Sequence, residues 1–262
     1  MTHLDLYDNR ISSLDNWLAK CTSLINLDLS FNLIRKIDDV KYLTKLEELW
    51  LANNKIRRIM PGLENCSNLR ILELGANRLK KIENLTLSSL QSLWMGRNRI
   101  SRIEGLDNLR YLKKLDLQAN RLTNIEGLSN LLCLEELYLS HNHISQIDGI
   151  SHLTSLKILD LSNNWIEHLE NLKTLTSLED LWMNDNRIGL LEETKEIADL
   201  TTLTTLYLER NPCADDVQYR VRVRLMLPQL KQLDATPIYH SGYPPIFKDE
   251  STTACITTPT CN

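Results

Sequence analysis

The sequence contains 262 residues, 42% of them hydrophobic and only 6% aromatic, so the chain can bury a sizeable core and that core must be largely aliphatic. No segment reaches the roughly 18 uninterrupted apolar residues that a membrane-spanning helix requires, and the opening MTHLDLYDNR is not a signal peptide. The net charge of −4 is too small to indicate a partner. We therefore expect a soluble protein that stays inside the cell.

A period of about 22 residues begins at Leu4 and continues to Asn211. Its spacing, L-x-x-L-x-L-x-x-N, is clearest at Leu134, Leu137, Leu139 and Asn142, and it predicts a leucine-rich repeat in which each unit is a strand, a turn and a returning segment. The residues that end the strands are Asn9, Asn32, Asn54, Asn77, Asn98, Asn120, Asn142, Asn164, Asn186 and Asn211. We expect an α/β solenoid of about ten units over residues 1–211, with a parallel sheet on its concave side.

The strand-ending asparagines have a physical explanation. Backbone groups lose their sheet partners where the chain turns out of each strand, and an amide can both donate and accept hydrogen bonds there, whereas an aspartate only accepts. The first unit is incomplete, because Leu4 is already a strand residue, and we expect fraying at that edge. The spacing predicts the largest insertion near Glu192 to Ile197.

The repeat pattern stops after Asn211. Asp215 and Asp216 lie where an N-cap and a first-turn acid belong, and Val217 to Leu227 is typical of a helix that stops before Pro228. We therefore predict a helical cap over residues 212–238. Residues 239–262 are rich in Ser, Thr and Pro, which predicts a disordered tail.

One residue of every predicted strand faces outward from the concave sheet, because strand side chains alternate. These residues are Asp5, Asp28, Trp50, Glu73, Trp94, Asp116, Tyr138, Asp160, Trp182 and Tyr207, and Asp180 lies in a parallel row two residues earlier. Aromatic rings flanked by acids are typical of a protein interface. Ten strands about 4.8 Å apart span roughly 43 Å, which suits a folded domain better than a small molecule.

Other classes of function have less support. A basic row follows the asparagines at Arg10, Lys55, Arg78, Arg99, Arg121, His143 and Arg187, but the acidic face would repel phosphate, so the sequence favours a solvated rim over a nucleic-acid surface. We find no glycine-rich phosphate loop, H-E-x-x-H or G-x-S-x-G, and expect neither catalysis nor a cofactor. Cys21, Cys66 and Cys133 fit neither a metal site nor a disulfide framework, and we expect buried free thiols.

Several motifs are more specific than the repeat itself. They are YLSHN at 138–142, WMNDN at 182–186, YLERNP at 207–212, QYR at 218–220, MLP at 226–228 and LDAT at 233–236. Together they closely resemble the protein phosphatase 1 regulatory subunit 7 family, over Leu4 to about Ile238.

The resemblance implies that the concave face binds the catalytic subunit of protein phosphatase 1 and controls its activity or maturation, in nucleus and cytoplasm. It implies family contacts at Asp28, Glu73, Asp160, Trp182 and Tyr207. At Trp50 and Trp94 the family often has another aromatic residue, and at Asp180 the longer glutamate, so the chemistry is kept at these three positions. The alternative within the same fold is a capped repeat scaffold for another complex, spliceosomal or dynein-associated.

Overall fold

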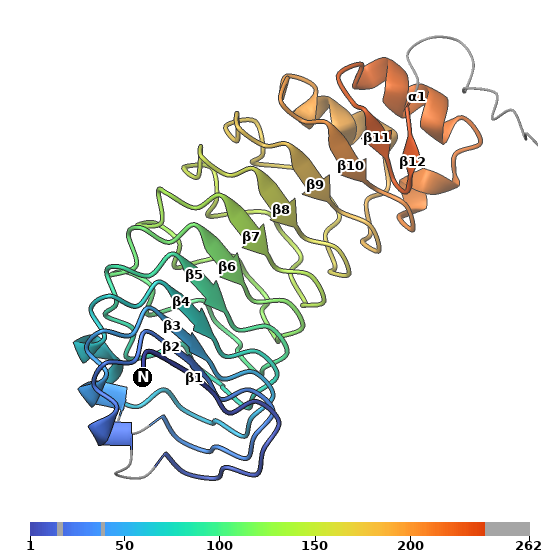
Figure 1. The fold of residues 1–262 in the computed structure, drawn as a ribbon. Helices are drawn as coiled ribbons and strands as arrows, with labels where there is room; N and C mark the ends of the chain where they lie inside the picture. The colour runs from blue at the N-terminus through green and yellow to red at the C-terminus, as the bar shows by residue number, and fades with distance from the viewer. Residues whose placement is uncertain (15–17, 38–39, 239–262) are drawn as a thin grey trace, which may run out of the picture.

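A single sheet runs the length of the computed structural model, which describes residues 1–14, 18–37 and 40–238 (Figure 1). Its parallel strands are β1 His3–Asp5, β2 Asn26–Asp28, β3 Glu48–Trp50, β4 Ile71–Glu73, β5 Ser92–Trp94, β6 Lys114–Asp116, β7 Glu136–Tyr138, β8 Ile158–Asp160, β9 Asp180–Trp182 and β10 Thr205–Tyr207. The predicted α/β solenoid is confirmed. The tail predicted at 239–262 lies outside the described residues.

The returning segments are mostly turns and short 3-10 helices. These are η1 Leu18–Lys20, η2 Val40–Tyr42, η3 Leu63–Asn65, η4 Leu191–Ile197 and η5 Pro212–Asp215. The insertion predicted near Glu192 to Ile197 is η4. None of the helices that the described residues form is long and apolar enough to cross a membrane.

The repeat length sets the register of the sheet. The middle residue of each strand lies opposite the middle residue of the next, as Leu115 does with Leu93 and Leu137. From Leu27 onward these leucines are 0% exposed, and they join one continuous core that is almost wholly aliphatic among the described residues.

The cysteines only partly match the prediction of buried free thiols. Cys66 and Cys213 are free thiols buried in the core, whereas Cys133 is exposed, which corrects the prediction that it is buried.

The asparagine ladder forms as predicted. Oδ1 of Asn142 accepts the N–H of Leu122 in the preceding repeat, and Nδ2 donates to the carbonyls of Leu117, Leu139 and Ser140 at 2.9–3.2 Å. The same pattern recurs in the other repeats from Asn32 to Asn186. Asn9 differs, because it is exposed and, within the part of the chain that the structure describes, bonds only the carbonyls of its own turn.

The C-terminal end is closed by η5, helix α1 Tyr219–Met226 and two further strands. β11 Gln232–Leu233 pairs parallel with β10, and β12 Thr236–Pro237 pairs antiparallel with β11. α1 packs against η4 and begins two residues later than the sequence predicts. The cause is local: Asp215 ends η5, and Asp216 accepts the N–H of Gln218 instead of capping the helix.

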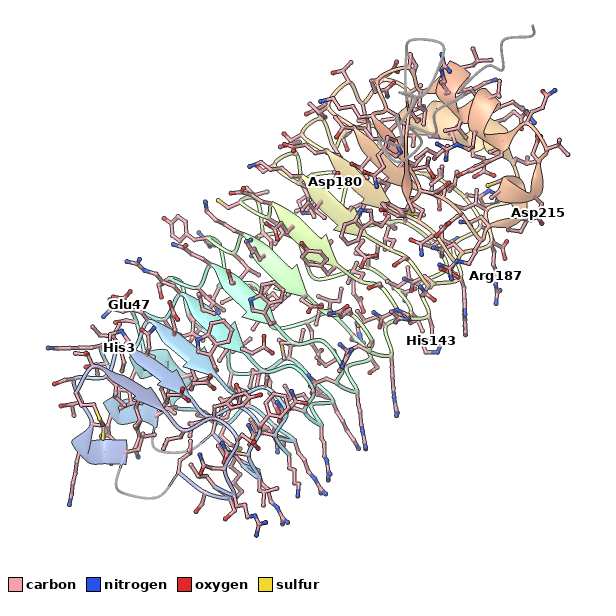
Figure 2. The ribbon with its side chains drawn as sticks, turned by 45° about the vertical axis from the view of Figure 1, so that its right-hand side comes forward. His3, Glu47, His143, Asp180, Arg187 and Asp215 are labelled. Atoms are coloured by element: carbon pink, nitrogen blue, oxygen red, sulfur yellow. The ribbon has the colours of Figure 1, made fainter. Side chains whose placement is uncertain are left out.

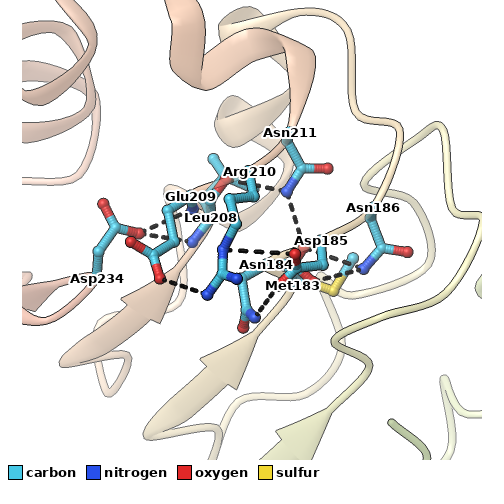
Figure 3. A network of polar contacts seen from close by, with 9 residues as sticks. All are labelled: Met183, Asn184, Asp185, Asn186, Leu208, Glu209, Arg210, Asn211 and Asp234. Atoms are coloured by element: carbon cyan, nitrogen blue, oxygen red, sulfur yellow. Dashed lines mark hydrogen bonds and ion pairs between the residues drawn. The ribbon is translucent and has the colours of Figure 1, made fainter. Parts of the chain in front are cut away.

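Asp234 directly follows Leu233, the residue that pairs with Leu206 of β10, and its carboxylate closes the end of the stack. Its Oδ1 accepts the N–H groups of Leu208 and Glu209 at 2.8 and 2.9 Å (Figure 3). It also accepts the hydroxyl of Tyr219 at 3.3 Å. Like the residues before each asparagine, Asp234 has a positive φ, 54°. An acceptor alone is sufficient here, because Leu208 and Glu209 offer donors.

Candidate protein-binding face

The last residue of each strand forms a single row across the sheet, which we call the face row. It consists of Asp5, Asp28, Trp50, Glu73, Trp94, Asp116, Tyr138, Asp160, Trp182 and Tyr207, each opposite its neighbour in strand register. The structure thus brings together ten of the eleven residues that the sequence places on the concave face. The eleventh, Asp180, starts β9 and is half-buried on the same face (Figure 2).

Four rings of the face row are in contact, and we call them the aromatic strip: Trp94, Tyr138, Trp182 and Tyr207. The ring centroids of Trp94 and Tyr138 are 6.3 Å apart, those of Tyr138 and Trp182 6.3 Å, and those of Trp182 and Tyr207 6.2 Å. The first three rings come from alternate strands, about 9.6 Å apart, so the rings lean toward one another over the strand between them. The strip is half-buried and continuous.

Trp50 stands apart from the aromatic strip. Its indole Nε1–H donates to Oε2 of Glu48 at 3.3 Å, and the same carboxylate oxygen accepts from Nδ2 of Asn26 at 3.1 Å. This bond holds the ring against the first residue of its own strand. Trp50 therefore offers a separate half-buried aromatic surface at the N-terminal part of the sheet.

Two acids of the face row are buried more deeply than its half-buried rings. Asp116 and Asp160 are each only 6% exposed, which differs from the outward placement that the sequence predicts. Their carboxylates close the following turn: Asp116 accepts the N–H of Gln118 at 2.8 Å, and Asp160 accepts both the N–H and the hydroxyl of Ser162. Strand alternation predicted the direction of these side chains but not the covering rings of neighbouring strands.

Burial also changes the charge of this row. Burial raises the pKa of Glu73 to about 7, although the N–H of Gly75 opposes the shift, and the negative charge of Asp116 adds to it. Burial likewise raises the pKa of Asp116, with a smaller contribution from Asp160. The centre of the face row is therefore less negative at neutral pH than its residue types indicate. Half-buried Asp28 and Asp180 are better placed to attract a basic partner than Glu136, which already pairs with Lys114 at 2.8 Å.

The indole nitrogen of Trp182 is a feature that sequence reasoning missed. Among the described residues it is the one buried side-chain nitrogen or oxygen without a hydrogen-bond partner. An unpaired buried donor costs about 1–3 kcal/mol, and such groups are rare in folded proteins. No sequence signal could reveal it, because the environment is made by residues from other repeats. A tryptophan at position 182 therefore costs folding stability, so stability alone does not explain why the chain has this side chain there.

The described residues offer little to catalysis. They contain no group of three or more His, Cys, Asp or Glu residues that could hold a metal ion. His143 lies edge-on to the ring of Trp165, at 4.7 Å between centroids, and His168 pairs with Glu193 at 3.1 Å. Each of these histidines is exposed and occupied by a structural contact.

Comparisons with known proteins agree with the fold. The sequence profile of the family described as "Leucine-rich repeat" matches residues 1–98 and 114–241, and one described as "Leucine Rich repeats (2 copies)" matches 88–130. A leucine-rich-repeat protein of Leptospira interrogans has a similar structure, with a TM-score of 0.72 and 29% identity, covering 87% of this chain and 65% of that one.

Three kinds of curated relative bear on function. A protein phosphatase 1 regulatory inhibitor subunit PPP1R7 homolog of Arabidopsis thaliana is 42% identical over 117 residues, 44% of this chain and 35% of that protein. A probable U2 small nuclear ribonucleoprotein A' of Drosophila melanogaster is 37% identical over 83 residues, 31% of each chain. The alpha subunit of geranylgeranyl transferase type-2 of Pongo abelii is 40% identical over 81 residues, 30% of this chain and 14% of that protein. The matches span about a third or less of these relatives. The first confirms the resemblance predicted from the motifs.

Proposed function

The chain belongs to the leucine-rich repeat family, and from this premise we propose that it is a regulatory, non-catalytic subunit that binds the catalytic subunit of protein phosphatase 1. Binding occurs through the face row and controls the activity or maturation of the phosphatase. The observation that carries the proposal is the aromatic strip, because a solvated sheet face needs no continuous row of four rings. Similarity to the PPP1R7 homolog supports the choice of partner.

Each part of the face has a distinct task in this proposal. Half-buried aromatic rings supply apolar area and are the residue type most often found at the energetic centre of interfaces. Trp50 and the aromatic strip bury against the phosphatase, while Asp28 and Asp180 attract its basic groups. Asp116 and Asp160 act indirectly, by closing the turns beneath the rings. Glu73 has a mixed character, because its pKa of about 7 makes its charge sensitive to pH near neutrality.

The experiment is a binding titration with the purified catalytic subunit of protein phosphatase 1. Trp182→Ala and Trp94→Ala should each weaken binding by about 2 kcal/mol, or roughly 30-fold in Kd. Trp165→Ala is the matched control. Its ring is 44% exposed but lies on another surface, beside His143 and Arg187, and its loss should leave Kd unchanged. Equal losses in all three variants, or full affinity in Trp182→Ala, would contradict the proposal.

A scaffold in another complex is the second candidate. It is favoured by one observation, the similarity to a U2 small nuclear ribonucleoprotein A'. The same face row would then hold a different protein, in a spliceosomal or dynein-associated assembly. Affinity purification of the full chain followed by mass spectrometry separates the two candidates by the identity of the partner. The phosphatase proposal also places the protein in nucleus and cytoplasm, which imaging of a tagged chain tests.

A further inference from the structure

A second charged surface lies on the edge where the chain leaves the strands. The third and fourth residues after the strand-ending asparagine are both basic in three consecutive repeats: Arg35 and Lys36, Arg57 and Arg58, and Lys80 and Lys81. Figure 2 shows long side chains ending in nitrogen along this edge, which also carries His143 and Arg187. Farther along, the same positions hold Ser101 and Arg102, Thr123 and Asn124, and then Glu167 and His168. The positive charge is thus concentrated near the N-terminal part of the solenoid.

These side chains enclose a hollow of about 400 Å³, which we call the basic hollow. It is lined by Arg35, Lys36, Lys55, Arg57, Arg58, Met60 and Arg78, so six of its seven lining residues are cationic. A neighbouring hollow of about 290 Å³ shares Arg57 and Arg58 and adds Lys80, Lys81 and Glu83. Three successive repeats contribute, and the rigid stacking of the repeats holds their side chains close together.

Most of this charge is uncompensated within the part of the chain that the structure describes. Arg58 forms a two-pronged ion pair with Glu83, at 3.0 and 3.2 Å. The other five cations of the basic hollow have no ion pair with a described carboxylate, and Asp38 and Asp39 lie outside the described residues. The whole chain has a net charge of −4, so the clustering is local and opposes the overall charge. Such a concave cluster focuses its field on an anion.

We propose that the basic hollow binds a compact, multiply phosphorylated small molecule. Its volume is in the range of small-molecule sites, about 300–1,000 Å³. Arginine forks match phosphate oxygens with paired hydrogen bonds, and lysines add compact charges. Several phosphate groups on one small molecule could pair with basic side chains from three repeats at the same time.

Two other polyanions fit less well. Single-stranded nucleic acid is held by stacking on aromatic rings as well as by charge, and no aromatic side chain lines the basic hollow. An extended acidic peptide would need the basic row to continue along the edge, but after Lys81 the paired cations give way to Ser101 and Arg102, Thr123 and Asn124, and Glu167 and His168. No lining residue belongs to the face row, so the proposal is independent of phosphatase binding.

The test is isothermal titration of the full chain with inositol hexakisphosphate as the probe, at about 0.15 M ionic strength. We expect saturable binding with one probe per chain. Arg57→Ala and Arg78→Ala should each weaken it by about tenfold, as expected for the loss of a charged hydrogen-bonding group. Arg121→Ala is the matched control, because it occupies the same repeat position as Arg78 two repeats farther on and lies outside the basic hollow. It should change Kd by less than about twofold.

Folding and ligand identity are checked in the same series. Arg57 and Arg78 are exposed and their removal relieves repulsion, so the melting temperatures of the free variants should be unchanged or raised. Parallel titrations use inorganic phosphate, a poly-glutamate peptide and a single-stranded RNA oligomer. Absence of saturable binding of the probe, equal losses in Arg121→Ala, or tighter binding of the peptide or the RNA would overturn the proposal.

Discussion

Replacing Asn142 by leucine tests the asparagine ladder in the middle of the solenoid. Three carbonyls lose the amide of Asn142, but each keeps another donor: Nδ2 of Asn120 on Leu117, Nδ2 of Asn164 on Leu139, and the N–H of Ala119 on Ser140. The N–H of Leu122 is different, because its described acceptor is Oδ1 of Asn142 alone. The substitution therefore leaves one buried donor unpaired.

The expected loss of unfolding free energy follows from this one unpaired N–H and the three carbonyls that keep a donor. An orphaned buried N–H costs about 1–3 kcal/mol, and the lost amide bonds to carbonyls that keep a donor add a smaller amount, so we expect Asn142→Leu to lose about 3 kcal/mol of unfolding free energy. In a protein of this size that corresponds to a fall in Tm of about 6–12 °C. Asn142→Asp should lose at least as much, because it retains the acceptor for Leu122 but sets a buried carboxylate against carbonyl oxygens.

Urea unfolding followed by circular dichroism measures the loss, with the m-value showing whether the transition keeps its character. The matched control is Asn9→Leu. Asn9 holds the same repeat position but is exposed, and among the described residues it accepts no N–H from another repeat, so its replacement should change the free energy of unfolding by no more than about 0.5 kcal/mol. Equal effects in the two variants, or an unchanged Tm in Asn142→Leu, would refute the ladder as a source of stability.

Two further predictions concern the face row and the returning side. The pKa of Glu73 is about 7 in the folded protein against an ordinary value of 4.5, so its contribution to stability is fully present below pH 4.5 and is lost as pH rises to about 7, by up to about 3 kcal/mol. Glu73→Gln should remove this part of the pH dependence of unfolding, and an unchanged profile would contradict the shift. Gly127 has a φ of +68°, and a Cβ there would lie 2.3 Å from the carbonyl oxygen of Ile103. Gly127→Ala should therefore cost about 2 kcal/mol or more in urea unfolding, whereas Gly189→Ala, with open space around it, should be nearly neutral; similar costs would disprove the contact argument.

The features predicted correctly from the sequence are those that repeat. Leu115 and its equivalents fix strands, register and core because each unit meets the same neighbours, and Asn142 follows from the needs of the backbone at the turn. The start of α1 was predicted two residues early, because Asp216 bonds the N–H of Gln218 at a turn that the helix pattern did not reveal.

The features that could not be predicted from the sequence depend on contacts between side chains of different repeats. Asp160 has the same place in its strand as Asp28, yet it is buried because Tyr138 and Trp182 meet over it. The unpaired indole nitrogen of Trp182 and the basic hollow arise in the same way. The outward position of Asp160 follows from strand alternation, but the covering depends on ring orientations that alternation does not determine.

The closing contacts of Asp234 have a consequence for protein engineering. The carboxylate of Asp234 bonds Leu208, Glu209 and Tyr219, all within the last unit and its cap. Whole units of 22 residues added or deleted upstream would therefore leave this terminus intact. Because α1 also packs against η4, the portable end-piece for artificial arrays of chosen length should run from Leu191 to Ile238.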